Sequence, residues 1–207
     1  MTNKSKFPKY FMTFFIGFVM LCFGVTFVYT ANYEPENTTI PKFGFVPNFT
    51  FDERSGGVVT KDDLYGEVWI ADFIFSNCGG GCPSMSENML KLQAEFANTP
   101  KIRLVSFTVD PDRDSVESLS EYANAYGAKK EKWLFLTGKK KFMYSLIQKG
   151  FRLPVDPNLG TDDEPILHSI YFVLVDKRGY LRGYYDSSNE KELVKLVTDA
   201  RTLLQKK

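Results

Sequence analysis

Two cysteines separated by three glycines are the residues of this chain best suited to chemistry. They lie in Phe75-Ser76-Asn77-Cys78-Gly79-Gly80-Gly81-Cys82-Pro83, between an apolar run that predicts a buried strand and a run that predicts a helix. Pro83 suits the first position of that helix, so we expect Cys82 at its N-cap. Backbone N–H groups and the helix dipole then favour thiolate over thiol. A thiolate pair can bind a metal ion or exchange with a disulfide.

His168, the only histidine of the chain, precedes the apolar run SIYFVLVD. In the predicted topology this strand starts on the side of the sheet that carries the cysteine loop, so the imidazole can approach both sulfurs. Two thiolates and an imidazole form a soft set of low coordination number, which suits Cu(I), whereas zinc would need a fourth ligand. We therefore predict a copper site made by Cys78, Cys82 and His168. Met85 lies one turn along the helix, where its place on an apolar stripe favours the core.

The elements that must position these residues follow from the apolar patterns. Val68–Phe75 and Ile102–Val109 predict buried strands, and Ser84–Ala97 predicts the helix between them. The remaining predicted elements are a hairpin of Asn48–Phe51 and Val58–Thr60, a helix that starts with a capping box of Asp114 and Glu117, a strand at Trp133–Leu136, a helix at Lys139–Lys149 closed by Gly150, a loop at Leu153–Leu167, a hairpin of Ser169–Val175 and Tyr180–Tyr185, and a final helix at Glu190–Leu204. This order predicts an α/β fold, a thioredoxin-like mixed sheet flanked by helices.

The sequence resembles the Sco/SenC family of copper-binding assembly factors for cytochrome c oxidase. The resemblance covers roughly Val46 to Leu204 and rests on Cys78-Gly-Gly-Gly-Cys82-Pro83, on Val109-Asp110-Pro111-Asp112-Arg113-Asp114, and on His168 ahead of Ser169–Asp176. It implies that Cys78, Cys82 and His168 bind Cu(I) or Cu(II), about one ion per chain. It also implies copper delivery to the binuclear copper site of an oxidase subunit, or reduction of the cysteines of that subunit. An upstream copper donor is a further expected partner.

Two positions depart from the pattern of the family. Leu167 stands where many members have an acid directly before the histidine, and Gly79-Gly80-Gly81 replaces bulkier, often acidic residues. Neither change removes a ligand. Both bear on the preferred oxidation state and on the client protein.

The leading hypothesis is a metallochaperone, which binds copper and hands it over without catalytic turnover. The main alternatives use the same two cysteines. A thiol–disulfide oxidoreductase would attack with Cys78 and resolve with Cys82, although the three-residue spacer departs from Cys-x-x-Cys. A structural disulfide between the two cysteines is another alternative. It is disfavoured because a disulfide that closes so short a loop constrains the unfolded chain very little. A peroxiredoxin-like peroxidase would need a Thr-x-x-Cys arrangement and an arginine that polarises the peroxide. Ser76 and Arg113 are poor substitutes for these groups. A calcium or magnesium site could use the carboxylates of Asp110, Asp112 and Asp114. These acids are explained better by a turn, by neutralisation by the adjacent arginine and by helix capping.

The N-terminus predicts a membrane anchor. The uncharged apolar run of residues 10–30 is 21 residues long, enough to cross a hydrocarbon core of about 30 Å as a helix. A cleaved signal peptide would have a shorter apolar region of about 7–15 residues, although Thr30-Ala31 leaves cleavage open. Cys22 lies inside this run and is expected to act only as a small hydrophobic residue.

The distribution of charge orients the chain. Lys4, Lys6 and Lys9 precede the span and Glu34 and Glu36 follow it, so the positive-inside rule places residues 1–9 in the cytoplasm and the rest outside. Residues 31–47 then form a linker, and residues 48–207 form the thioredoxin-like copper-binding domain. A bacterial periplasm or cell envelope is favoured over the mitochondrial inner membrane because no Arg-rich presequence is present.

Charge also excludes one class of function. Beyond the three N-terminal lysines, acidic residues outnumber basic ones by two. Such a domain has no overall field that would attract a polyanion. We therefore expect no binding to nucleic acid.

Overall fold

A computed structural model describes residues 15–24, 40–77, 82–159 and 166–205. Two compact units can be distinguished, Met1–Thr39 and Ile40–Lys207. In the first, residues 15–24 are helical, and the rest of the predicted anchor lies outside the described residues. No helix among the described residues combines the length and apolar character needed to cross a membrane.

The second unit is built on one mixed sheet of eight strands in the order β1-β10-β9-β4-β5-β6-β2-β3. Strands β4, β5 and β6 run parallel, and β9 pairs antiparallel with β4. Its strands are β1 Gly44–Phe45, β2 Thr50–Glu53, β3 Val58–Thr60, β4 Val68–Ile74, β5 Ile102–Thr108, β6 Trp133–Thr137, β9 Tyr171–Val175 and β10 Tyr180–Asp186. A separate two-stranded sheet pairs β7 Val155–Asp156 with β8 Leu167–His168.

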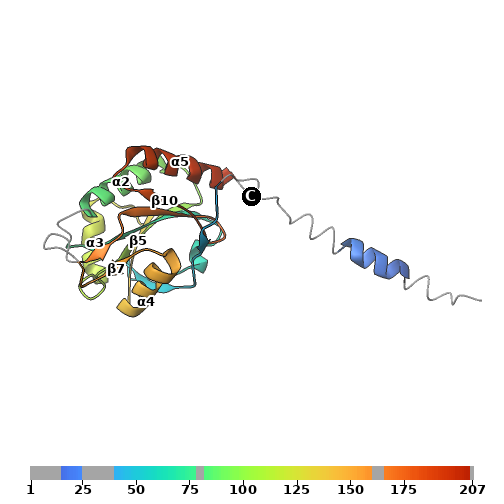
Figure 1. Ribbon diagram of the computed structural model, residues 1–207, viewed down its shortest axis with the longest axis horizontal. Coiled ribbons are helices and arrows are strands. Elements are labelled where there is room, and N and C mark those ends of the chain that lie inside the picture. Colours follow the sequence, from blue (N-terminus) through green and yellow to red (C-terminus); the bar gives the residue numbers. More distant parts are fainter. Residues whose placement is uncertain (1–14, 25–39, 78–81, 160–165, 206–207) are drawn as a thin grey trace, which may run out of the picture. The chain divides into compact units, whose positions relative to one another are not determined.

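Helices cover both faces of the sheet. They are the 3-10 helix η1 Asp62–Leu64, α2 Cys82–Glu95, α3 Val116–Ala125, α4 Lys140–Ser145 with its continuation as the π-helix η2 Leu146–Phe151, and α5 Glu190–Gln205. Figure 1 shows α2 and α5 together on one side of the sheet and α4 on the other. This arrangement confirms the predicted thioredoxin-like mixed sheet flanked by helices.

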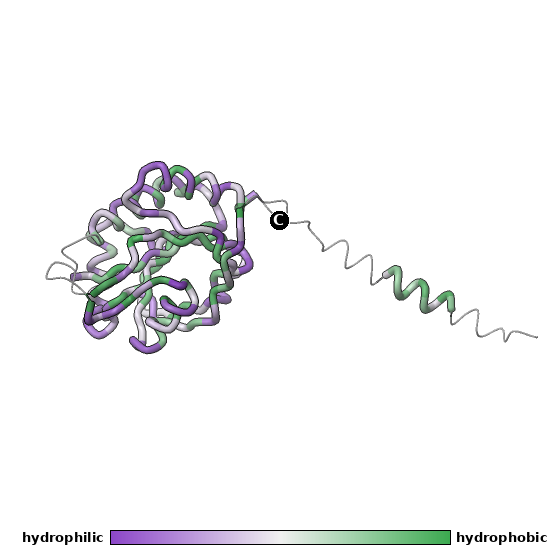
Figure 2. Tube along the Cα trace, viewed as in Figure 1, coloured by the Kyte–Doolittle hydropathy of each residue, from purple (hydrophilic) through white to green (hydrophobic). Residues whose placement is uncertain are grey.

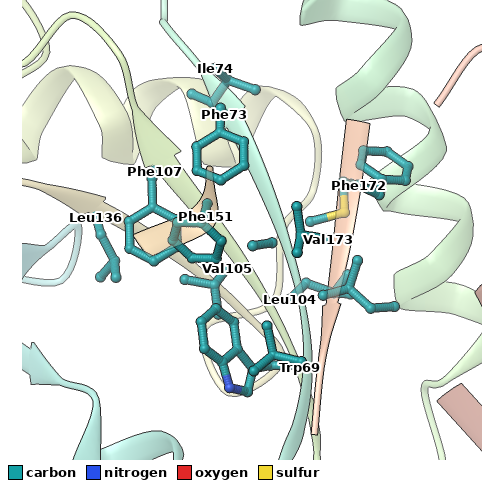
Figure 3. Packing of buried hydrophobic residues seen from close by; sticks show 14 of the residues in the cluster. Trp69, Phe73, Ile74, Leu104, Val105, Phe107, Leu136, Phe151, Phe172 and Val173 are labelled. Atoms are coloured by element: carbon teal, nitrogen blue, oxygen red, sulfur yellow. The ribbon is translucent and has the colours of Figure 1, made fainter. Parts of the chain in front are cut away.

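The core sits on the central strands, because β4 is buried along its whole length. Figure 2 shows apolar residues concentrated on these strands and polar residues on the outer helices and loops. On one side of the strands the rings of Phe73, Phe107 and Phe151 cluster, while Phe172 lies on the other side (Figure 3). Burial on both faces explains why the parallel strands read as continuous apolar runs.

Two helix boundaries differ from the expectation. The N-cap of α3 is Ser115, whose side chain accepts from the Ser118 N–H, so the predicted capping box of Asp114 and Glu117 is wrong. The helix from Lys140 does not close at Gly150 but continues to Phe151. A Cβ on Gly150 would lie 2.8 Å from Cδ of Pro47, so the glycine permits close packing rather than ending the helix.

Candidate metal centre

The structure brings two of the three predicted ligands together. Cys82 is the first residue of α2 and is fully buried, and His168 ends β8 with 9% of its surface exposed. The Cys82 Sγ lies 3.4 Å from the His168 Nε2. Ligands at about 2.3 Å (sulfur) and about 2.0 Å (nitrogen) from one metal ion are about 3.5 Å apart at a tetrahedral angle. The sulfur and nitrogen are thus spaced as two ligands of a single ion would be.

The orientation of the imidazole suits metal binding. The His168 Nδ1 lies 3.2 Å from the Ser169 carbonyl oxygen, which can only accept, so Nδ1 carries the proton in this hydrogen bond. The lone pair of Nε2 is then directed to the sulfur. The ring of Phe75 packs edge-on against the imidazole, with centroids 5.7 Å apart, and Val155 pairs with His168 in the small sheet. Backbone and aromatic contacts therefore set the tautomer and the angle of the ring.

Cys78 and the three glycines lie outside the described residues. The segment that leads to them is held by Asp114, which is buried. The Asp114 carboxylate accepts from the backbone N–H of Ser76 at 3.2 Å and from the hydroxyls of Ser76 and Thr108. Asp114 thus fixes the approach to Cys78, a role that the sequence analysis missed. This role was missed because an aspartate just before a helix is also expected to cap that helix.

A pair of hydroxyl groups lies one helical turn beyond Cys82. The Ser86 Oγ and the Tyr122 OH are 2.8 Å apart and link α2 to α3. Burial raises the pKa of Tyr122, and the charge on Cys82 adds to the rise. Met85 is buried in the core, as its position on the apolar stripe predicted.

Asp72, on β4, is an ionisable group that the sequence analysis missed. It is fully buried, and burial raises its pKa to about 7, while interactions with the neighbouring Ser106 hydroxyl and with His168 oppose the rise. Neither carboxylate oxygen has a partner of hydrogen-bonding geometry among the described residues, so burial dominates. The only sequence signal was one acid inside the otherwise apolar run VWIADFIF.

The acidic segment after β5 forms a turn held by ion pairs. Arg113 lies 3.4 Å from the Asp110 carboxylate, and Lys140 lies 2.7 Å from that of Asp112. Burial raises the pKa of Asp110. Neutralisation by the adjacent arginine agrees with the interpretation of this segment as structural.

The described part of the chain contains no group of three His, Cys, Asp or Glu side chains placed to hold a metal ion. Cys82 and His168 form a pair, and the predicted third ligand is Cys78. The soft donor set still fits copper better than a hard cation. A thioredoxin-like domain with a buried cysteine–histidine pair at the start of a helix is the class that the fold and the site define.

Comparison with known proteins identifies the family. The family model described as SCO1/SenC matches residues 37–204. The SCO1 protein homolog of Bacillus subtilis (strain 168) is 31% identical over 187 residues, which cover 89% of this chain and 90% of that protein. The chain belongs to the SCO1/SenC family.

Solved structures agree with this assignment. BsSco, described as a member of the Sco family of cytochrome c oxidase assembly proteins with a disulfide switch, matches with a TM-score of 0.72 and 30% identity, covering 82% of this chain and all of that chain. Yeast Sco1 with copper bound matches with a TM-score of 0.62 and 26% identity, covering 78% of this chain and 90% of that chain. These structures share the thioredoxin-like fold with this chain.

Proposed function

We propose that this protein is a copper metallochaperone that binds about one copper ion per chain through Cys78, Cys82 and His168. The observation that carries the proposal is the 3.4 Å separation of the Cys82 Sγ and the His168 Nε2. Membership of the SCO1/SenC family and the copper bound to the yeast relative support it. The recipient is the binuclear copper site of cytochrome c oxidase, because the related BsSco is an oxidase assembly protein.

Transfer requires that the ligands release the ion in sequence. Among the described residues, His168 sits on a strand of two residues that pairs only with β7, whereas Cys82 is the fully buried first residue of a 14-residue helix. Displacing the imidazole therefore breaks fewer interactions than displacing the sulfur. His168 leaves first, and a ligand of the recipient takes its place while the thiolates still hold the ion.

The site acts outside the cytoplasm. Residues 10–30 anchor the chain as a single transmembrane helix with the N-terminus inside, and the domain faces the bacterial periplasm or cell envelope. The apolar character of the described residues 15–24, whose large hydrophobic side chains are mostly exposed, supports this location.

Anaerobic titration of the full-length chain with Cu(I) tests the proposal. We expect one bound ion for the wild type and for the control Cys22→Ser, which changes a cysteine of the other compact unit. Cys78→Ser and Cys82→Ser should each abolish tight binding, and His168→Ala should weaken it at least about tenfold. Equally tight binding of Cu(I) by the double cysteine variant would refute the assignment.

A thiol–disulfide oxidoreductase is the second candidate, favoured by the disulfide switch described for BsSco. Cys78 would attack the disulfide of the client and Cys82 would resolve the mixed disulfide. Cys82 is fully buried, as a resolving residue can be. Trapping of a client peptide by Cys82→Ser, together with a redox potential able to reduce that peptide, would support this reaction. A lack of trapping would leave copper binding as the sole role of the pair.

A further inference from the structure

The small sheet that carries His168 cannot be extended by hydrogen bonds from β7. Strand β7 pairs with β8 over two residues, with Val155 opposite His168. Pro154 and Pro157 occupy the two positions of the chain from which this pairing would continue. Because proline has no N–H group, it cannot donate to a strand partner. The position of His168 therefore depends on contacts that β7 makes outside the small sheet.

The side chain of Gln148 makes such a contact. Its Nε2 donates to the Val155 carbonyl oxygen at 3.0 Å. Gln148 belongs to η2 and is exposed, and an exposed glutamine on a helix ordinarily bonds to solvent. Among the described residues, Gln148 is the one whose side chain reaches the backbone of β7 from another element. The bond is thus made to the very residue that faces His168.

The π-helical turn gives Gln148 a rigid base. The ring of Phe151, the last residue of η2, packs edge-on against Trp69 and Phe73, with centroids 6.0 Å and 5.0 Å apart (Figure 3). The Phe151 carbonyl oxygen accepts from the Tyr184 hydroxyl at 2.9 Å. Segments of π-helix are frequent at functional sites. Here the segment is fastened to β4 and β10, so the Gln148 bond ties β7 to the large sheet.

A continuous series of contacts therefore runs from the core to the metal centre. It passes from Gln148 to Val155, across the small sheet to His168, and from the His168 Nε2 to the Cys82 Sγ at 3.4 Å. Cys82 itself belongs to α2 and does not depend on β7. Loss of the Gln148 bond would thus loosen one member of the Cys82–His168 pair and leave the other in place.

We propose that Gln148 is a positioning residue of the metal centre: its hydrogen bond to Val155 keeps β7 and β8 together and so limits how often His168 moves away from Cys82. The consequence for copper rests on the proposed function. Gln148 does not contact the ion, so it acts on the lifetime of the complex through His168. One hydrogen bond between uncharged groups changes a local opening equilibrium by about twofold to tenfold.

Amide hydrogen exchange of the reduced, metal-free, full-length chain, followed by NMR, tests the proposal. Gln148→Met keeps the length of the side chain and removes the donor, so the protected amides of β7 and β8 should exchange about twofold to tenfold faster. The amides of β4 should keep their wild-type rates. Gln148→Lys restores a donor and should recover most of the protection. Lys149→Met, the same replacement at the next exposed position, should behave as the wild type.

A second measurement links the strand to the ion. Loss of Cu(I) from the loaded chain to a chelator should be faster in Gln148→Met by a factor similar to that of exchange, and unchanged in Lys149→Met. Unchanged exchange in β7 and β8, or equal acceleration in β4, would overturn the proposal. Faster exchange with an unchanged loss of Cu(I) would overturn the part of Gln148 in holding His168. A chain that binds no Cu(I) would refute the proposed function, and the metal-free measurement would still decide whether Gln148 holds the strands.

Discussion

Replacing Asp72 by asparagine should stabilise the metal-free protein at neutral pH but not in acid. Burial raises the pKa of Asp72 from its ordinary value of 3.8 to about 7. This difference of about 3 units corresponds to about 4 kcal/mol at about 1.4 kcal/mol per unit. Asparagine keeps the size and shape of the side chain but cannot ionise, so it avoids that cost.

The direction of the pH dependence follows from proton binding. Between about pH 4 and pH 7 the folded protein holds the Asp72 proton more tightly than the unfolded chain does, so rising pH destabilises the wild type. Below about pH 4 both states are protonated, and the wild type and Asp72→Asn should be nearly equally stable. The advantage of the variant should grow as the pH rises through 7 and then level off at about 4 kcal/mol.

Urea denaturation followed by tryptophan fluorescence measures this effect, because Trp69 and Trp133 are fully buried. Free energies of unfolding would be compared at intervals from pH 4 to pH 8 for the reduced, metal-free wild type, Asp72→Asn and the exposed control Asp52→Asn. The control should follow the wild type. An advantage of Asp72→Asn that is the same at pH 4 and pH 8, or absent at both, would refute the account of Asp72 as a buried acid with a raised pKa.

Three further substitutions test the supports of the site and of the fold. Ser115→Ala removes the N-cap of α3 and should lower the free energy of unfolding by about 1 kcal/mol in urea; Ser115→Asp should restore most of it, and no loss would contradict the cap. Asp114→Ala removes the acceptor that holds Ser76 and should weaken Cu(I) binding at least about tenfold in a competition titration; an unchanged affinity would show that this anchor does not position the ligands. Arg182→Met breaks the 2.7 Å buried ion pair with Asp176 and should cost about 3–5 kcal/mol; a cost below about 1 kcal/mol, measured by calorimetry, would contradict the pairing.

The central elements could be predicted because local pattern and tertiary environment agree. Strands β4 and β5 are buried on both faces, so a continuous apolar run was a reliable sign of each. The hairpin of β9 and β10 was predicted from Asp176-Lys177-Arg178-Gly179, and Gly179 has the positive φ of 86° that such a turn requires. Cys82 and His168 were predicted to converge because the start of α2 and the approach to β9 lie at one edge of the sheet.

Other features depend on contacts that local sequence does not encode. Asp114 and Ser115 are both good capping residues, and only the distant donors of Ser76 and Thr108 decide which of them caps α3. Arg152 takes a left-handed conformation with φ 58° beyond the π-turn, where Gly150 had predicted the end of the helix. The position of His168 on a short strand of its own, separate from β9, arises from pairing with Val155.

Because β8 is so short, the thermal stability of the domain and the lifetime of the bound ion can change independently. In the part of the chain that the structure describes, β7 and β8 form a separate sheet with two residue pairs, so they can part while the eight-stranded sheet stays intact. The rate at which His168 swings away is then set by a local opening rather than by the global unfolding equilibrium. Substitutions in the deep core can therefore erode the thermal tolerance of the domain while the lifetime of the bound ion stays nearly constant.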